Sequence, residues 1–136
     1  MQKIFFIFIL SLALFSCETE SKFTIEGNIT DAQGNMLYLE HVGVSKTSLI
    51  DSVKLKANGH FKFSKKRPDS PNFYRLKLNK QFIDLAIDST EIIKIQTDSA
   101  FFAKNYTIEG SENCLKIKEL SILRNNTANT DRKSVV

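Results

Sequence analysis

The sequence predicts an all-β fold, an antiparallel β-sandwich or open barrel of about seven to nine short strands with a short C-terminal helix. Apolar and polar residues alternate from residue 22 onward, which is the period of a strand with one buried face. Turn residues interrupt this alternation about every 8 to 12 residues, a spacing that favours a sandwich or barrel over βαβ units. After residue 110 the apolar residues recur at helical spacing instead.

The first strands follow from alternation and from the turns between them. Four residues of segment 22–30 share one face: Phe23, Ile25, Gly27 and Ile29. A turn at residues 31–35 leads to expected strands at residues 36–42 and 48–55. Asn58-Gly59 then lies between two alternating segments, which is the strongest short-range hairpin signal. We therefore expect residues 60–64 to return as the second strand of a hairpin with residues 48–55.

The remaining elements follow Pro68 and Pro71, which place a loop after the fourth strand. Alternation predicts four more strands, at residues 72–78, 82–88, 92–97 and 105–109. Ser111 is suited to the N-cap of a helix, and Glu112 to the positive end of its dipole. Apolar residues at helical spacing then predict an amphipathic helix over residues 114–124.

Residues 1–16 have the pattern of a bacterial secretory signal: a charged start with Lys3, a short apolar run from Ile4 to Leu14, and the small residue Ser16 before Cys17. A Cys at this place makes the pattern a lipobox, so we expect a diacylglycerol on the Cys17 thiol, cleavage before it and acylation of the new amino terminus. The apolar run is several residues short of a transmembrane helix. Two or three acyl chains would form a stable membrane anchor.

Composition argues against nucleic acid as a partner. From Cys17 onward the chain has 18 Lys and Arg against 15 Asp and Glu, because only Lys3 precedes that residue, and these charges are interspersed. The chain lacks Trp and has no basic stretch with interleaved stacking aromatics. The one basic cluster, Lys65-Lys66-Arg67, is typical of a solvated loop after a strand, with contact to anionic lipid headgroups as the alternative.

The side chains that bear chemistry form no recognisable catalytic motif. Lipidation of Cys17 leaves Cys114 without an intramolecular partner, and we expect Cys114 to be a small buried residue on the helix. His41 and His60 lack the ligand spacing of a zinc site and are interpreted as surface imidazoles. Asp84 and Asp88 share one face of the strand at residues 82–88, where a hydrolase-like carboxylate pair is the alternative to plain surface charges. We therefore expect no catalytic residue, cofactor or metal in this chain.

The order of several short motifs carries a resemblance to a known family. After the lipobox come Phe23–Ile29, Met36–Leu39, Ile50–Val53, Asn58–Phe63 and Tyr106–Ser111. In this order the chain resembles the N-terminal domain of unknown function that precedes a thioredoxin-like (AhpC/TSA-type) domain in Bacteroidetes lipoproteins. The resemblance covers residues 23 to about 124. It implies a β-rich domain joined by a helix to a thiol–disulfide oxidoreductase domain whose Cys-x-x-Cys is absent from this sequence, so no catalytic residue is carried over.

The predicted organisation is a signal at 1–16, a tether at 17–22, a β-sandwich domain at 23–110, a linker helix at 111–124 and a disordered tail at 125–136. Residues 131–136 are what GAT CGG AAG AGC GTC GTG encodes, a run found in common sequencing adapters and followed by a TAG stop. We therefore expect residues 131–136 to be adapter read-through on a truncated reading frame. The alternative is an ordinary polar tail.

Three tripeptides are similar to the Asp-Ser/Thr-x sites of Bacteroidetes periplasmic O-glycosylation. They are Asp51-Ser52-Val53, Asp88-Ser89-Thr90 and Asp98-Ser99-Ala100, and they make Ser52, Ser89 and Ser99 candidate acceptors. Intact-mass measurement of the exported protein would test them.

Two hypotheses for the function remain. In the first, the chain is the membrane-anchored, non-catalytic N-terminal domain of an exported thiol–disulfide oxidoreductase-like lipoprotein, with the redox domain missing in cis. In the second, it is a complete small periplasmic or surface lipoprotein that binds a ligand or protein. Either would be lipid-anchored to the inner or outer membrane, facing the periplasm or the cell surface.

Overall fold

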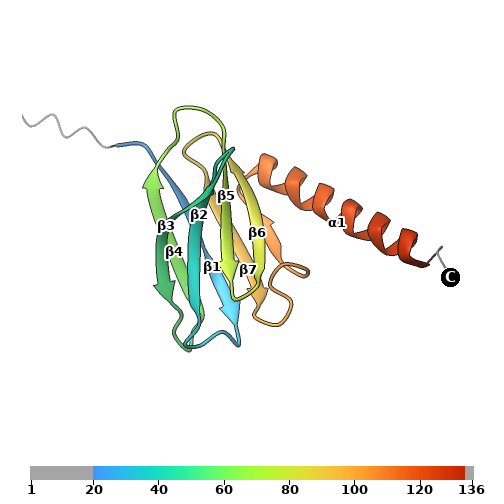
Figure 1. The fold of residues 1–136 in the computed structure, drawn as a ribbon. Coiled ribbons are helices and arrows are strands. Elements are labelled where there is room, and N and C mark those ends of the chain that lie inside the picture. The colour runs from blue at the N-terminus through green and yellow to red at the C-terminus, as the bar shows by residue number, and fades with distance from the viewer. Residues whose placement is uncertain (1–19, 134–136) are drawn as a thin grey trace, which may run out of the picture.

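The computed structural model describes residues 20–133, in which two four-stranded sheets pack face to face and one helix follows them (Figure 1). Cys17 and residues 134–136 lie outside the described residues. The elements in chain order are β1 (Lys22–Thr30), β2 (Met36–Val42), β3 (Thr47–Lys54), β4 (His60–Lys66), β5 (Asn72–Leu78), β6 (Gln81–Ile87), β7 (Ile92–Asp98), β8 (Thr107–Glu109) and α1 (Glu112–Lys133). The predicted sandwich is confirmed, with eight strands within this part of the chain.

The strand order differs from a simple meander. Sheet A has the order β4-β1-β7-β8, and sheet B has the order β3-β2-β5-β6. All paired strands are antiparallel except β1 and β7, which run parallel with Gly27 opposite Ile95. The prediction of antiparallel pairing is therefore correct for the described strands except for the pair β1–β7.

The core lies between the two sheets and is built from the faces that alternation identified. In β1, β2, β5, β6 and β7 most inward positions are buried, apart from Gly27 and positions at the strand ends, and the outward ones are half-buried or exposed. Burial of these branched and aromatic side chains is the main favourable term in folding. The largest fully buried side chains are Phe23, Phe102, Ile25, Ile29, Leu37, Leu39, Leu55, Leu76, Leu78, Ile83, Leu85 and Ile87.

The predicted hairpin at Asn58-Gly59 is wrong. β3 belongs to sheet B and β4 to sheet A, so residues 54–60 carry the chain from one sheet to the other. The turn itself is present, since the Gly59 N–H donates to the Lys56 carbonyl at 3.0 Å and Gly59 has φ of 68°. Burial of Leu55 directs this segment across the sandwich, where β4 pairs with β1. The Asn-Gly pair thus specified a turn but not the partner strand.

A β-bulge in the pair β2–β3 changes which side chains share a face. Leu39 is paired with Asp51, whereas the next residue, Glu40, is paired with Leu49. Ile50 is the extra residue, so Leu49 joins the solvent-facing side and is 61% exposed. Simple alternation had placed Leu49 on the same face as Val53, which packs against the core.

Helix α1 is longer than predicted. It begins at Glu112 and continues to Lys133, so the prediction of a disordered segment after Arg124 is wrong for residues 125–133. Neither Gly nor Pro interrupts this stretch. The Thr127 and Thr130 hydroxyls donate to the carbonyls four residues earlier at 3.0 Å, so these polar residues fit within the helix.

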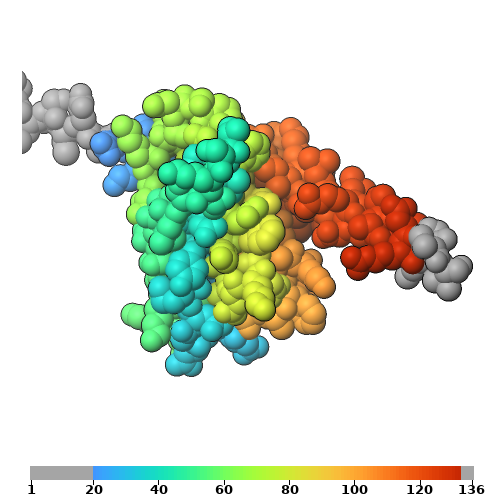
Figure 2. All heavy atoms as spheres, in the orientation of Figure 1, coloured from blue at the N-terminus to red at the C-terminus, as the bar shows by residue number. Residues whose placement is uncertain are grey.

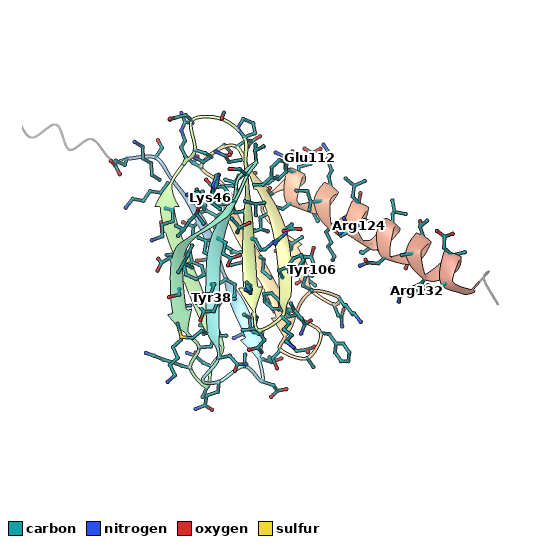
Figure 3. The ribbon with its side chains drawn as sticks, in the orientation of Figure 1. Tyr38, Lys46, Tyr106, Glu112, Arg124 and Arg132 are labelled. Atoms are coloured by element: carbon teal, nitrogen blue, oxygen red, sulfur yellow. The ribbon has the colours of Figure 1, made fainter. Side chains whose placement is uncertain are left out.

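Only the first part of α1 packs on the sandwich. Cys114 is buried, and Ile117, Lys118 and Ser121 are half-buried, whereas residues 122–132 are all exposed. The helix starts beside β6 and then leaves the sheets as a projecting arm (Figure 1). Figure 3 shows Glu112 at the sandwich end, Arg124 midway and Arg132 at the far end. No helix within residues 20–133 is long and apolar enough to cross a membrane.

Candidate functional site

The two carboxylates considered as an acid–base pair are held by different partners. The Asp84 carboxylate accepts a hydrogen bond from Arg75 Nε at 2.8 Å on the outer face of sheet B. The Asp88 carboxylate accepts one from the Asn113 side chain of α1 at 2.9 Å. Both residues lie outside the core, as alternation predicted. Asp84 joins β6 to β5, and Asp88 joins the end of β6 to α1.

The two histidines lie in different sheets. His41 in β2 is half-buried, with its Nε2 3.3 Å from Asn72 Oδ1 and its ring edge-on to Tyr74 at 5.6 Å. His60 is exposed on the outer face of sheet A. Within residues 20–133 no group of three or more His, Cys, Asp or Glu side chains is placed to hold a metal ion.

Cys114 is a buried free thiol in the first turn of α1. Its Sγ–H donates to the Ala86 carbonyl at 3.4 Å on the edge of β6. Burial raises the pKa of the Cys114 thiol, so the thiol is protonated and shielded at neutral pH. The structure therefore places Cys114 as a packing residue between helix and sheet, as expected from the sequence.

The basic cluster extends β4 rather than forming a loop. Lys65 and Lys66 are both in β4, since Lys66 pairs with Lys22 of β1, and only Arg67 follows the strand. The Lys65 ammonium lies 2.5 Å from the Asp51 carboxylate of β3. This ion pair joins the edge of sheet A to the edge of sheet B and lowers the pKa of Asp51.

The candidate glycosylation serines differ in accessibility. Ser52 is exposed on the edge strand β3. Ser89 is half-buried in the connection between β6 and β7. The Ser99 hydroxyl donates to the Asp31 carbonyl at 2.6 Å and is half-buried. Of the three, Ser52 presents the most accessible hydroxyl, and its modification stays a prediction.

The most distinctive exposed surface is the outer face of sheet B around Arg75, which sequence reasoning did not single out. The Arg75 guanidinium lies 3.9 Å from the centroid of the Phe82 ring and also pairs with Asp84. Glu40 is the cross-strand partner of Arg75 on the other side. We call this surface the Arg75 face, made of Tyr38, Glu40, Phe73, Arg75, Phe82 and Asp84.

Two exposed aromatic rings distinguish the Arg75 face from an ordinary solvated sheet. Phe73 is 56% exposed and Phe82 is 43% exposed. A hollow of about 250 Å³ between this face and α1 is lined by Val42, Phe73, Arg75, Asp84 and Ile117. Figure 2 shows this side of the molecule, with β2, β5 and β6 in front and α1 projecting from the edge. Exposed rings around a fixed guanidinium suit recognition of a partner.

The sequence did contain a signal for the Arg75 face. Alternation placed Phe73 on the same side as Arg75 and Lys77, opposite the apolar Tyr74, Leu76 and Leu78. An aromatic ring on the solvent side of a strand was the available clue. The partners of Arg75 on β2 and β6 depend on the strand order, which the sequence did not provide.

The fold and the surfaces above can be compared with known proteins. The model of a family described as "Domain of unknown function (DUF4369)" matches residues 23–114. This chain belongs to the DUF4369 family. The match runs from β1 to the first turn of α1, so the projecting part of the helix lies beyond the DUF4369 domain. No curated protein matches the chain.

One solved structure similar to this chain is titled "Crystal structure of (S)-allantoin synthase". The alignment has a TM-score of 0.44 at 8% sequence identity and covers 68% of this chain. It covers 45% of that chain, so the matched part is less than half of the larger protein.

Proposed function

We propose that this chain is the lipid-anchored, non-catalytic N-terminal DUF4369 domain of an exported thiol–disulfide oxidoreductase-like lipoprotein. The proposal is supported by the lipobox that ends at Cys17 and by the family match that begins at residue 23. It is also supported by the sequence resemblance to domains that precede a thioredoxin-like domain in Bacteroidetes lipoproteins. The domain would sit in the cell envelope and hold a redox domain near the membrane.

The geometry suits a spacer between an anchor and a second domain. Residues 18–21 separate Cys17 from β1, so the chain reaches at most about 17 Å from the lipidated residue to the sandwich. At the other end, α1 has 22 residues, of which 122–132 project beyond the sandwich over about 17 Å. A domain attached beyond this projecting part would be displaced from the sandwich by about that length.

The observation that carries the proposal is a group of exposed apolar side chains midway along α1. Leu120 is 65% exposed, Leu123 is 62% exposed and Ile122 is 44% exposed. Helix stability in proteins comes mainly from packing of an apolar face, yet Leu120 and Leu123 are mostly exposed, and only Ile122 shares a hollow with Tyr106 of the sandwich. A following domain seated on the arm would cover them.

The native gene provides the direct test of this proposal. Genomic DNA across the locus is expected to continue in frame beyond codon 124 into a thioredoxin-like sequence with a Cys-x-x-Cys motif. The protein from the complete gene is then expected to reduce insulin disulfides, whereas this chain alone is not. A native stop codon after residue 136 would overturn the redox part of the proposal.

Anchoring is tested separately on this chain. Metabolic labelling with a radioactive or alkyne-tagged fatty acid is expected to label the wild type and not the Cys17→Ser variant. The labelled wild type is expected in the membrane fraction. The Cys17→Ser variant is expected to accumulate as the unprocessed precursor. Labelling that survives Cys17→Ser would contradict lipidation at this residue.

A second candidate function is a complete small lipoprotein that binds a protein through the Arg75 face. The exposed rings of Phe73 and Phe82 favour it. In that case photo-crosslinkers at residues 73 and 82 would capture one partner in the cell envelope, and Phe73→Ser would abolish capture by the crosslinker at residue 82. Crosslinkers at exposed residues of sheet A, such as Thr107, would serve as the matched control.

A further inference from the structure

We propose that a basic hollow on the outer face of sheet A binds a soluble, hydroxyl-rich polyanion of the sulfated or phosphorylated oligosaccharide class. The hollow has a volume of about 680 Å³ and lies over β1, β4 and β7, next to the end of β3. Its charged lining consists of Lys54, Lys56, Lys62 and Lys94, together with Glu26 and His60. This site is independent of the redox and anchoring functions proposed above.

The position of the hollow follows from the register of sheet A. Glu26 pairs with Lys62 of β4 on one side and with Lys94 of β7 on the other, so the three side chains form one cross-strand row. Asn28, His60 and Gln96 form the row two residues further along. The row between them turns its side chains into the core, which leaves backbone as the floor of the hollow.

The charge of the hollow is unbalanced. Four lysines and one glutamate line the hollow, an excess of three positive charges, and Glu109 of β8 borders it as the cross-strand partner of Lys94. Among residues 20–133, ion pairs within 4.0 Å involve Lys65, Arg75 and Lys116, and none of the four lysines of the hollow. These ammonium groups are therefore available to an anionic ligand.

Two asparagines on the rim, Asn28 and Asn58, are held in place before a ligand arrives. The Asn28 side chain donates a hydrogen bond to the Asn58 carbonyl, which ties β1 to the connection between β3 and β4. The His60 N–H donates to Asn58 Oδ1 at 3.1 Å. The Gln96 amide makes no hydrogen bond within the described residues and is free to bind a hydroxyl or an anionic oxygen. A rim ordered in this way lowers the entropic cost of binding.

The arrangement of charges selects the class of ligand. One exposed ammonium binds one anion weakly because water screens the pair, so useful affinity needs several contacts at once. Glu26 lies between Lys62 and Lys94, where its carboxylate repels a central anion and accepts hydrogen bonds from hydroxyl groups. A sugar with anionic groups spread around its hydroxyls satisfies both requirements.

The hollow lacks what a nucleic-acid site uses. The one phenyl ring in its lining, Phe61, is 5% exposed and points into the core, which leaves the His60 imidazole as the sole ring that could stack on a base. An oligonucleotide would contact the lysines through phosphates alone. The structure therefore favours a carbohydrate polyanion over single-stranded nucleic acid.

The test is calorimetric titration of the full-length chain, purified in a neutral detergent, with a heparin hexasaccharide. Binding is expected at low salt and is expected to weaken as ionic strength rises. Neutral maltohexaose is expected not to bind. The double variant Lys62→Gln/Lys94→Gln is expected to lose roughly tenfold in affinity, since it removes two of the four ammonium contacts.

A matched control separates this site from general attraction to a basic protein. Lys22→Gln/Lys66→Gln removes the same charge from the same face of sheet A, in a cross-strand pair outside the hollow. It is expected to change the affinity less than twofold. Equal losses in the two double variants, or no binding of the hexasaccharide at low salt, would overturn the proposal.

Glu26 provides a second, independent readout. Glu26→Gln is expected to strengthen binding of inorganic pyrophosphate, because a repulsive charge is removed. The same variant is expected to gain less for the hexasaccharide than for pyrophosphate, because the carboxylate also accepts bonds from sugar hydroxyls. An equally large gain in affinity for the hexasaccharide would reject the oligosaccharide class. Tighter binding of a DNA hexanucleotide than of the hexasaccharide would reject it as well.

Discussion

At Gly27 the two parallel strands of sheet A come too close for any side chain. A Cβ built at this position would lie 1.7 Å from the backbone oxygen of Ile95 in β7. Backbone atoms in the middle of a sheet cannot yield as a flexible side chain can. The glycine is therefore required by packing, which alternation alone, grouping Gly27 with Phe23, Ile25 and Ile29, does not reveal.

Gly27→Ala is expected to lower the free energy of unfolding by about 3 kcal/mol or more, because β1 and β7 must separate to admit the methyl group. Urea denaturation followed by circular dichroism measures this loss. Gly34→Ala is the matched control, since the space at Gly34 is open and only its φ of 82° opposes a side chain. It is expected to cost about 1 kcal/mol. Equal losses in both variants would contradict the close-approach argument.

We expect the buried Cys114 thiol to make the free energy of unfolding fall as the pH becomes alkaline. Its pKa is raised in the folded chain by burial, so the folded state holds the proton at pH values where the unfolded state has lost it. Burial also raises the pKa of Tyr106 to about 12. Both groups therefore favour the folded state below their unfolded pKa values, and this contribution falls as the pH rises towards their folded pKa values.

Stability is expected to decline from about pH 8.5, where an unfolded thiol ionises, and more steeply from about pH 10 as tyrosine ionises. Cys114→Ala is expected to flatten the first part of this decline and to leave the second. Urea midpoints measured between pH 7 and pH 11 for both proteins provide the comparison. An unchanged slope between pH 8.5 and pH 10 in Cys114→Ala would show that the thiol is not the titrating group.

At the scale of single elements, α1 is fixed to the sandwich through Ser111, the residue that caps its N-terminus. The Ser111 hydroxyl accepts a hydrogen bond from the Cys114 N–H at 3.3 Å, which confirms the predicted N-cap. The same hydroxyl donates to the Glu91 carboxylate at 2.8 Å, so the cap is also tied to the turn before β7. Ser111 is 5% exposed.

Ser111→Ala is expected to lower the free energy of unfolding by about 1 to 2 kcal/mol, because it removes the cap and leaves Glu91 without its donor. Ser121→Ala is the control on the same helix. Its hydroxyl bonds only to the Ile117 carbonyl at 2.9 Å, a bond that the helix does not need. Ser121→Ala is expected to change stability by less than about 0.5 kcal/mol. A Ser111→Ala loss no larger than this would contradict the capping role.

The elements also show what the sequence could predict. Strand positions were recoverable because burial of one face imposes alternation, as in Asn72–Leu78, whose predicted and observed bounds agree. The pairing partner of His60–Lys66 was not recoverable, because a turn at Asn58-Gly59 is compatible with a hairpin and with a crossing between sheets. The end of α1 was misplaced because Asn and Thr are weak helix formers, yet no breaker follows Arg124.

At the scale of the whole molecule, different contacts join the edges of the two sheets along the two sides of the sandwich. On one side the edge strands β3 and β4 are joined by the Asp51–Lys65 ion pair. On the other side α1 packs against β6, the edge of sheet B, and β8, the edge of sheet A. The Lys118 ammonium lies 5.1 Å from the centroid of the Tyr106 ring, next to this closure. These long-range contacts, like the Arg75 face and the basic hollow, depend on a strand order that local sequence patterns do not encode.

Asp51→Asn is expected to cost at most about 0.5 kcal/mol at pH 7, because both partners of the ion pair are about one-third exposed and water screens them. The pKa of Asp51 is lowered in the folded chain, chiefly by the bond from Lys65. Its contribution is therefore present above the unfolded pKa of about 3.9 and is lost as the pH falls through the lower folded pKa. Wild type and Asp51→Asn are expected to converge in urea unfolding as the pH falls through this lowered pKa. A difference that persists at pH 2 would exclude this electrostatic origin.

The parallel pairing of β1 with β7 has a consequence for how the chain folds. β1 is the first strand made, yet one of its neighbours is separated from it by more than 60 residues of chain. β5–β6 and β2–β3 close over short connections, so sheet B can assemble early, whereas sheet A must await the seventh strand. Until Ile92–Asp98 has been synthesised, one edge of the first strand stays open to any other extended peptide. We therefore expect the insertion of Lys22–Thr30 between its two neighbours to be the slow step of folding and the step at which aggregation competes most.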